Sequence, residues 1–237
     1  VVSGSLLGAA AADGILKKRD VRSGDRIIMT KRPGLEGTAI IADDLADALR
    51  ARAVSPTVIE AASGFADRLS IFEEARVATE SGRAVALHDV TEGGVATALE
   101  ELARAAGLSI RVDLDALDPY PETRTLCEAL RVDPLGLIGS GSLLIAVRPA
   151  DEAVMLELLA EAGTEARPVG EAAKAARTGA GRGGSTPRTT ADDADAAAGS
   201  RPASPYLTGV RGGEEVPFPR FDVDELARLY SRLGTED

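Results

Sequence analysis

The sequence of 237 residues contains few cysteine, histidine and aromatic residues, and each shortage excludes a class of chemistry or structure. The single cysteine, Cys127, permits neither an internal disulfide nor a zinc site built from several cysteines. Its apolar neighbours Leu126, Ala129 and Leu130 favour a buried structural thiol over a reactive one. Tryptophan is absent and aromatic residues make up 3% of the chain, so the core has to be built from aliphatic side chains.

Several common motifs are absent as well. The sequence has no GxxxxGK[ST] segment and no GxGxxG turn after a strand, so it lacks the standard nucleotide-binding loops. The one histidine, His88, and the one cysteine, without a GxSxG elbow, give little support to a nucleophile–base pair. A lone histidine is more often a hydrogen-bonded structural residue than a metal ligand, and we predict no metal site in this chain.

The sequence also lacks long apolar runs and a positive charge balance. No run approaches the roughly 20 apolar residues of a membrane-spanning helix, and no signal peptide is recognisable. The net charge of −11 would repel nucleic-acid phosphates and acidic membrane surfaces. We therefore expect a cytoplasmic protein that binds neither nucleic acid nor membrane. Because Val1 opens directly into patterned sequence, we also expect the chain to be part of a longer protein.

What the sequence does contain is an alternation of strand-like and helical patterns, which predicts an α/β (α+β) sandwich with a mixed β-sheet. Glycine at position 107 is expected to end one of the helices. The expected strands are short apolar or alternating runs at residues 26–30, 84–88, 109–114 and 143–147. The expected helices repeat apolar residues every three to four positions and start near residues 38, 55, 71, 92, 122 and 151.

The composition then changes abruptly. Residues 170–206 contain no Leu, Ile, Val, Met or Phe and cannot offset a backbone ordering cost of about 1–2 kcal/mol per residue. A hairpin should follow with its turn at Gly212-Gly213, and Asp222 should cap a last helix. We predict a main domain at 1–173, a disordered low-complexity insertion at 174–204, and a closing hairpin and helix at 205–237.

The segment from His88 to Gly94 reads His-Asp-Val-Thr-Glu-Gly-Gly and lies between an expected strand and an expected helix. Such a turn places free backbone N–H groups at the positive end of a helix, which is a natural seat for phosphate or another anion. Asp89 and Glu92 could help to bind a magnesium–phosphate group. Carboxylates near a helix start are also ordinary partners of the helix dipole, so both interpretations stand.

Two further glycine loops adjoin expected strands, at residues 31–38 and 139–142. A single glycine loop usually only turns the chain. Three such loops on a short α/β chain favour convergence on one pocket. Lys31 and Arg32 could bind an anion there, or they could be solvated loop charges.

Three motifs, in this order and spacing, resemble the C-terminal half of the AIR synthase superfamily, and particularly its hydrogenase-maturation HypE branch. They are GDR…K…GLEGTA at residues 24–39, HDVTEGGVA at 88–96, and CEAL…DPL…GSGSLL at 127–144. The resemblance covers residues 1–173 and resumes at residue 205.

The resemblance implies a mixed sheet with helices packed against it, in the C-terminal domain of a two-domain, ATP-dependent enzyme of ligase or dehydratase type. In that family the N-terminal domain binds most of the ATP and forms the dimer. The two domains enclose a cleft in which ATP activates an amide, carboxamide or phosphate-type oxygen. The implied cofactors are ATP and Mg. The implied partners are a second copy of the chain, an N-terminal ATP domain in cis or in trans, and a small-molecule or protein-tail substrate.

The same resemblance assigns roles to residues of this chain. His88, Asp89 and Glu92 would be catalytic. Contacts to substrate or phosphate would come from Thr91, Gly93, Gly94, Gly37, Thr38, Gly139, Ser140 and Gly141.

The chain departs from the HypE branch in ways that motivate an alternative function. Glu92 stands where the branch usually has arginine, and the chain ends Gly-Thr-Glu-Asp where HypE proteins end in the cysteine that carries the carbamoyl group. No N-terminal ATP domain is present in the sequence. The alternative is a non-catalytic maturation or scaffold module related to HypE. On either interpretation we expect the chain to be inactive alone.

Overall fold

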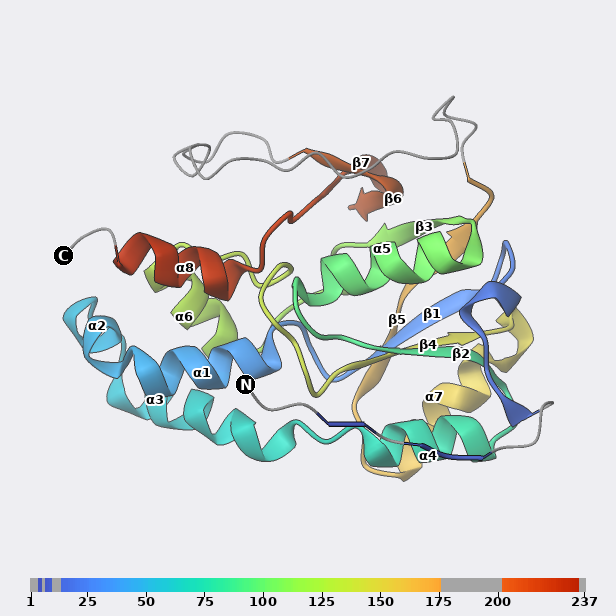
Figure 1. The fold of residues 1–237 in the computed structure, drawn as a ribbon, viewed down its shortest axis with the longest axis horizontal. Coiled ribbons are helices and arrows are strands. Elements are labelled where there is room, and N and C mark those ends of the chain that lie inside the picture. Colours follow the sequence, from blue (N-terminus) through green and yellow to red (C-terminus); the bar gives the residue numbers. More distant parts are fainter. Residues whose placement is uncertain (1–3, 6, 10–13, 176–201, 235–237) are drawn as a thin grey trace.

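The computed structural model describes residues 4–5, 7–9, 14–175 and 202–234. It confirms the predicted fold class, because a mixed seven-stranded sheet carries helices on both faces (Figure 1). The strand order is β2-β4-β1-β5-β3-β6-β7, and neighbouring strands are antiparallel except for the parallel pair β3–β6. The strands are β1 (Arg26–Thr30), β2 (Ala84–Asp89), β3 (Ser109–Asp113), β4 (Leu143–Val147), β5 (Ala166–Ala173), β6 (Ala203–Arg211) and β7 (Glu214–Pro219).

The helices form two groups, one packed on the sheet and one beyond its end (Figure 1). Helices α4 (Phe72–Glu80), α5 (Gly94–Ala106) and α7 (Glu152–Glu161) cover the sheet, and short 3-10 turns precede or join these elements. The other group comprises α1 (Leu35–Asp44), α2 (Ala46–Ala51), α3 (Pro56–Ser63), α6 (Pro121–Leu130) and α8 (Glu225–Leu233). The 3-10 turns are η2 (Lys18–Asp20), η3 (Gly64–Arg68) and η4 (Pro149–Asp151).

The central strands are apolar on both faces because helices cover both. Successive side chains of a strand point to opposite faces, so Ile27 and Met29 of β1 join the core under α5. Ile28, between them, joins the core formed with α4 and α7, which includes Met155 and Leu159. The run of five buried residues in β4 has the same cause.

The second group of helices has a core of its own, built around Ile41, Leu126 and Leu137 at one end of the sheet. Cys127 belongs to this core and is buried, which confirms the expectation of a structural thiol. Burial raises the pKa of the Cys127 thiol, and the nearby acidic side chains of Asp133 and Glu225 add to this.

Three helix boundaries differ from the predictions, and local geometry explains each. Helix α1 begins at Leu35 rather than near residue 38, directly after Gly34 with its left-handed φ of 73°. Helix α5 begins at Gly94 rather than at residue 92, because Gly93 and Gly94 both adopt positive φ, 76° and 64°. The cap of α8 is Asp224, not Asp222, because only the Asp224 side chain accepts the N–H of the second helical residue.

The main element that the sequence did not reveal is β5. It contains Pro168, Gly170 and several alanines, which have low strand propensity. It is held by pairing with β1 on one side and β3 on the other, and Val169 and Ala172 are buried there. Strand β6 begins at Ala203, inside the limit expected for the insertion. Residues 176–201, the bulk of that expected insertion, lie outside the described residues.

The predicted hairpin is confirmed: β6 and β7 pair antiparallel around Gly212 and Gly213, whose φ angles are 57° and 86°.

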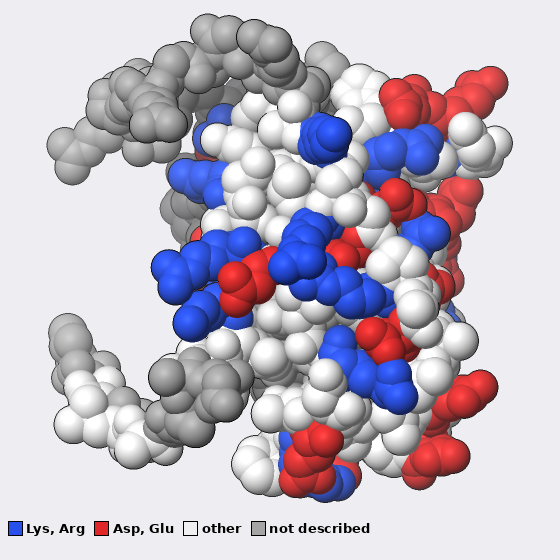
Figure 2. Space-filling view, turned by 90° about the vertical axis from the view of Figure 1, so that its right-hand side faces the viewer, with Lys and Arg blue, Asp and Glu red and all other residues white. Residues whose placement is uncertain are grey.

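At the end of the sheet where β1 begins, basic and acidic side chains alternate across the surface (Figure 2). Ion pairs there include Arg148 with Asp25 and Arg26 with Glu152. Within the described residues, no helix is both long and apolar enough to cross a membrane.

Candidate functional site

The candidate site is the edge of the sheet where β1 and β2 end. Strand β4 is antiparallel to both, and β5 is antiparallel to β1, so β4 and β5 begin at the same edge. The glycine loops at residues 31–38, 88–94 and 139–142 therefore lie at the same end of the sheet. The contacts between them are made by main chain: Gly37 N–H donates to Ile138 O at 2.9 Å, and Gly139 N–H donates to Thr91 O at 3.3 Å.

The glycines at this edge serve close packing rather than an open phosphate cradle. A Cβ atom on Gly37 would lie 2.4 Å from Cγ of Leu137. A Cβ atom on Gly94 would lie 2.5 Å from the carbonyl oxygen of Leu135. Contacts this short leave room only for glycine, so the three loops form a solid junction.

Six of the predicted ligand contacts are buried in the described structure: Gly37, Thr38, Gly93, Gly94, Gly139 and Gly141. Gly37, Gly139 and Gly141 are buried, and the Gly141 carbonyl accepts a hydrogen bond from Lys31. Thr38 is fully buried, and its hydroxyl is satisfied there because it donates to Gly34 O at 2.6 Å and lies 2.8 Å from the hydroxyl of Thr123. Gly94 is closed off by the 135–137 main chain and its N–H donates to Thr91 O.

Lys31 is also engaged inside the protein. Its Nζ atom lies 2.6 Å from a carboxylate oxygen of Glu74 and donates to the carbonyls of Ser70 at 2.8 Å and Gly141 at 2.7 Å. The side chains of Lys31 and Glu74 are 13% and 4% exposed. Lys31 is therefore neither an anion ligand nor a solvated loop charge, and it clamps the 139–142 loop to the start of α4.

His88, to which the resemblance assigns a catalytic role, does not face the open edge. Its side chain is 8% exposed because the pleat of β2 turns it toward α5. Lys18 Nζ lies 2.7 Å from its Nδ1, and Glu101 lies 3.0 Å from its Nε2. Burial and then the Lys18 ammonium lower the pKa of His88, outweighing Glu101 and Asp89, which favour the charged ring.

These contacts define the form of the imidazole. An ammonium group has no acceptor, so Lys18 donates to an unprotonated Nδ1. Nε2 then carries the hydrogen and donates to Glu101. His88 is thus a neutral, hydrogen-bonded link between η2, β2 and α5 in the described structure.

The anion seat predicted at the start of α5 is filled by a carboxylate of the chain itself. Asp224 Oδ2 accepts the N–H of Gly93 at 2.6 Å, and its other oxygen accepts the N–H of Leu226 at 2.8 Å. One side chain therefore neutralises the positive ends of both α5 and α8. The sequence pattern did not reveal this, because the pair Gly93–Asp224 is 131 positions apart.

The predicted site residues that remain open at the edge are Asp89, Thr91 and Glu92, which are exposed, and Ser140, which is partly exposed. Glu92 borders a groove of about 570 Å³ between the start of α5 and α8. Its apolar lining comes from Ile138, Phe221, Val223, Leu226 and Ala227, and its polar lining from Glu92, Thr97, Asp222, Asp224 and Tyr230.

Two carboxylates near the junction, those of Glu101 and Glu36, could not be identified from the sequence. Glu101 holds the imidazole of His88. Glu36, in the first turn of α1, has a buried Oε2 atom that lacks a hydrogen-bond partner within the described part of the chain. Nothing in the local pattern distinguishes either residue from an ordinary solvated helix carboxylate.

The open carboxylates can be compared with what a magnesium–phosphate group requires. Mg²⁺ usually binds through one or two carboxylates together with phosphate oxygens and water. Asp89 and Glu92 offer that donor chemistry, whereas no group of three His, Cys, Asp or Glu side chains among the described residues could hold a metal ion by itself. The residues present therefore fit a metal that arrives with a phosphate ligand.

Fold and site together define an α/β domain whose three glycine-bearing loops meet at one edge of a mixed sheet. The chain belongs to the family described as AIR synthase related protein, C-terminal domain, whose model matches residues 22–181.

Curated relatives come from the hydrogenase-maturation branch. Carbamoyl dehydratase HypE of Rhodobacter capsulatus is 41% identical over 88 residues, which are 37% of this chain and 24% of that protein. A putative hydrogenase expression/formation protein of Methanocaldococcus jannaschii is 28% identical over 176 residues, 73% of this chain and 50% of that protein. Carbamoyl dehydratase HypE of Bradyrhizobium diazoefficiens is 31% identical over 165 residues, 68% of this chain and 44% of that protein. The chain spans half or less of the length of these relatives.

Solved structures share the fold. A crystal structure of Escherichia coli HypE has a TM-score of 0.64 at 19% identity and covers 90% of this chain and 55% of its own. HypE in complex with ATP has a TM-score of 0.58 at 19% identity, with 92% and 56% covered. A HypE–HypF complex has a TM-score of 0.56 at 17% identity, with 86% and 55% covered. ATP binding and a protein partner are thus recorded for neighbours of this fold.

Proposed function

We propose that this chain is the C-terminal, substrate-side domain of an ATP-dependent enzyme that activates an amide, carboxamide or phosphate-type oxygen. The observation that carries the proposal is the exposure of Asp89, Thr91 and Glu92, from the family-matched segment, at the edge where three loops converge. The curated relatives named carbamoyl dehydratase support an enzyme of this class. They do not favour the alternative of a non-catalytic scaffold.

In this proposal the chain's own residues bind and orient. The Asp89 and Glu92 carboxylates hold a magnesium–phosphate group, and the hydroxyls of Thr91 and Ser140 donate to its oxygens. His88 is a positioning residue, since its Nδ1 lies 3.7 Å from Asp89 and its ring fixes the end of β2. Mg-ATP, when bound, supplies the phosphoryl group that turns the substrate oxygen into a leaving group.

The proposal extends to partners. We infer a homodimer, an ATP-binding domain in cis or in trans, and a small-molecule or protein-tail substrate. The solved HypE–ATP and HypE–HypF complexes support ATP and a protein partner by analogy of fold. Light scattering on the purified chain measures the oligomeric state.

The site is tested by measuring the thermal stability of the chain with ATP, with and without Mg²⁺. A ligand that binds only the folded chain stabilises it by about 1.4 kcal/mol at ten times its Kd. We expect stabilisation by Mg-ATP, loss of that stabilisation in the Asp89→Asn/Glu92→Gln variant, and retention in Glu157→Gln, which removes an exposed carboxylate of α7.

Two results contradict the proposal. The first is an equal response of the parent and the double variant to Mg-ATP, or no response at all. The second is rapid ATP hydrolysis by residues 1–237 alone, because that activity would place the complete catalytic machinery on this chain.

A further inference from the structure

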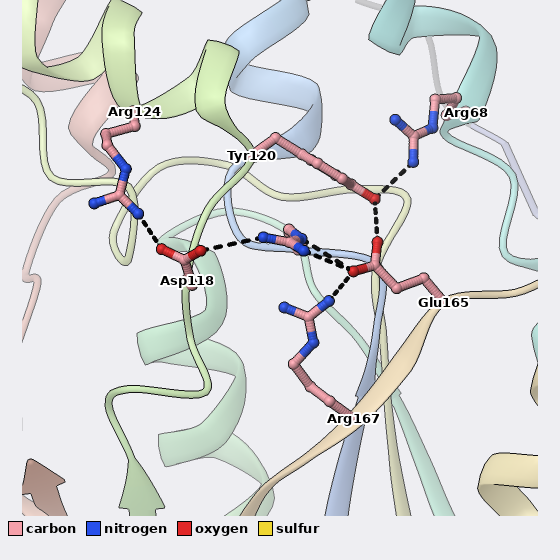
Figure 3. A network of polar contacts seen from close by, with 7 residues as sticks. Arg68, Asp118, Tyr120, Arg124, Glu165 and Arg167 are labelled. Carbon is pink, nitrogen blue, oxygen red and sulfur yellow. Dashed lines mark hydrogen bonds and ion pairs between the residues drawn. The ribbon is translucent and has the colours of Figure 1, made fainter. Parts of the chain in front are cut away.

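A second polar cluster lies at the same edge of the sheet and is not part of the site above (Figure 3). It gathers side chains from five separate segments: the loop after β1, η3, the loop after β3, the start of α6 and the start of β5. We call it the arginine cluster, and its members are Arg32, Arg68, Asp118, Tyr120, Arg124, Glu165 and Arg167.

The cluster has more positive than negative charge. The cluster contains four guanidinium groups and two carboxylates, an excess of two positive charges on a chain whose net charge is −11. Glu165 accepts from both Arg32 and Arg167, and Asp118 pairs with both Arg32 and Arg124. Because arginine stays protonated in proteins, this excess cannot be relieved by loss of a proton.

Arg68 is the member without an acidic partner. Within residues 14–175 and 202–234 its guanidinium donates to the Tyr120 hydroxyl at 2.6 Å, and no carboxylate pairs with it. It stacks over the Tyr120 ring at 4.6 Å and over the Phe65 ring at 5.3 Å. Arg32 also stacks on Tyr120, at 5.1 Å. Stacking fixes the plane of a guanidinium and leaves its N–H edge for an anion.

Both oxygens of the carboxylate at the centre of the cluster, that of Glu165, accept hydrogen bonds from other members. Tyr120 donates to Glu165 Oε2 at 2.9 Å, and Arg32 donates twice to Oε1, at 2.9 and 3.1 Å. Burial opposes ionisation of Glu165, but the hydrogen bonds from Arg32 and Tyr120 outweigh it, so the pKa of Glu165 lies below its usual value. The side chains of Arg32 and Arg167 are only 26% and 21% exposed, so water screens their charge incompletely.

The cluster lies beside the candidate functional site. Ser142 Oγ donates to Arg32 O at 3.0 Å, and Val90 N–H donates to Ser142 O at 3.1 Å, which ties the ends of β1 and β2 together across β4. Two strand spacings separate those ends, about 10 Å. On its other side, at Asp118 and Arg124, the cluster adjoins a hollow of about 580 Å³ whose apolar lining includes Leu114 and Pro134.

We propose that the arginine cluster is an anion subsite that binds a phosphate group, either free phosphate or the phosphate of a monoester whose organic part occupies the adjoining hollow. A phosphate dianion matches the excess of two positive charges. Its tetrahedral oxygens accept from guanidinium groups that approach from different segments, whereas a carboxylate needs only one bidentate arginine. The role of the bound ligand at this edge rests on the proposed function, whereas phosphate binding by the cluster does not depend on it.

The test is calorimetric titration of the full chain with inorganic phosphate in EDTA at constant ionic strength. Saturable binding is expected, and Arg68→Gln should raise the Kd about tenfold or more, because a hydrogen bond to a charged group contributes about 1.5–3 kcal/mol. Arg68 is the informative position because its removal leaves no unpaired carboxylate. The matched control is Arg50→Gln, which removes an exposed arginine of α2 that pairs only with Asp47 among the described residues.

The outcomes separate this inference from the proposed function. The magnesium-free conditions remove the contribution of Asp89 and Glu92, so Asp89→Asn/Glu92→Gln should bind phosphate like the parent chain. Tighter binding of a phosphate monoester than of free phosphate would support use of the hollow, and equal binding would assign the subsite to free phosphate. Absence of phosphate binding by the parent chain, or equal Kd values for Arg68→Gln and Arg50→Gln, overturns the inference even if Mg-ATP binds.

Discussion

The buried pair Lys31–Glu74 gives the sharpest quantitative prediction. Replacing Lys31 with Met keeps a long unbranched side chain at a residue whose φ is 53°, so the backbone strain at this position is unchanged. The substitution removes the ammonium from three acceptors at once: the Glu74 carboxylate and the carbonyls of Ser70 and Gly141.

The expected loss is large because Glu74 has no access to water to replace its partner. Its side chain is 4% exposed, and removing one member of a buried ion pair costs about 3–5 kcal/mol. The total free energy of unfolding of a domain is about 5–15 kcal/mol, so Lys31→Met removes a major part of it. Adding Glu74→Leu eliminates the orphaned carboxylate, and the double variant should recover about 1–3 kcal/mol relative to the sum of the single changes.

Urea unfolding followed by circular dichroism measures all four corners of this cycle. As a control, Arg76→Ala breaks two exposed ion pairs on α4, with Glu73 and Glu80, and should leave the free energy of unfolding unchanged within error. The reasoning fails if Lys31→Met costs less than about 1 kcal/mol, or if the effects of the Lys31 and Glu74 substitutions simply add.

Three further predictions follow from the same structure. The imidazole of the single histidine, His88, can be followed by NMR, and its titration midpoint should lie below the ordinary value of about 6.5, since burial and the Lys18 ammonium disfavour the charged ring. Lys18→Met should raise this midpoint. A midpoint at or above about 6.5 in the parent chain would contradict the assignment. Because this folded-state pKa is lowered, the contribution of His88 to stability is complete above pH 6.5 and is lost as the pH falls through the folded pKa. Gly94→Ala should lower the free energy of unfolding in urea by about 3 kcal/mol or more, because φ is +64° and the new Cβ would meet a carbonyl oxygen at 2.5 Å. Gly107→Ala, at φ +69° in open space, should lower it by about 1–2 kcal/mol. Equal losses for the two variants would refute the packing argument. The Cys127 thiol should react with a disulfide reagent only after unfolding, and rapid reaction of the native chain would show that it is not buried.

Much of the fold could be predicted because its signals are local. The apolar run of β4 and the periodic face of α5 with its terminal Gly107 identify themselves within a few residues. Strand β5 could not be recognised in the same way. Its proline and alanines carry little strand signal, and it becomes a strand because β1 and β3 supply partners on both sides.

The site was predictable in location but not in chemistry. Glycine loops beside strands indicated three segments of interest, and the structure brings those segments together at one end of the sheet. The partners of Lys31 and Gly93, however, lie 43 and 131 positions away, so only the folded chain shows that both are occupied. The position of His88, in contrast, follows from local sequence. The two-residue period of β2 places His88 on the same face as Ala86, which belongs to the core under α5.

The pairing of β3 with β5 on one side and β6 on the other has a consequence for the connection between those two strands. Ala172 of β5 and Leu207 of β6 both pair with Ile110, from opposite sides. The chain therefore leaves the sheet and returns to it at the same end, across a gap of about 10 Å that a few extended residues can bridge. A short linker that joins the ends of β5 and β6 is therefore compatible with the strand order of the described sheet.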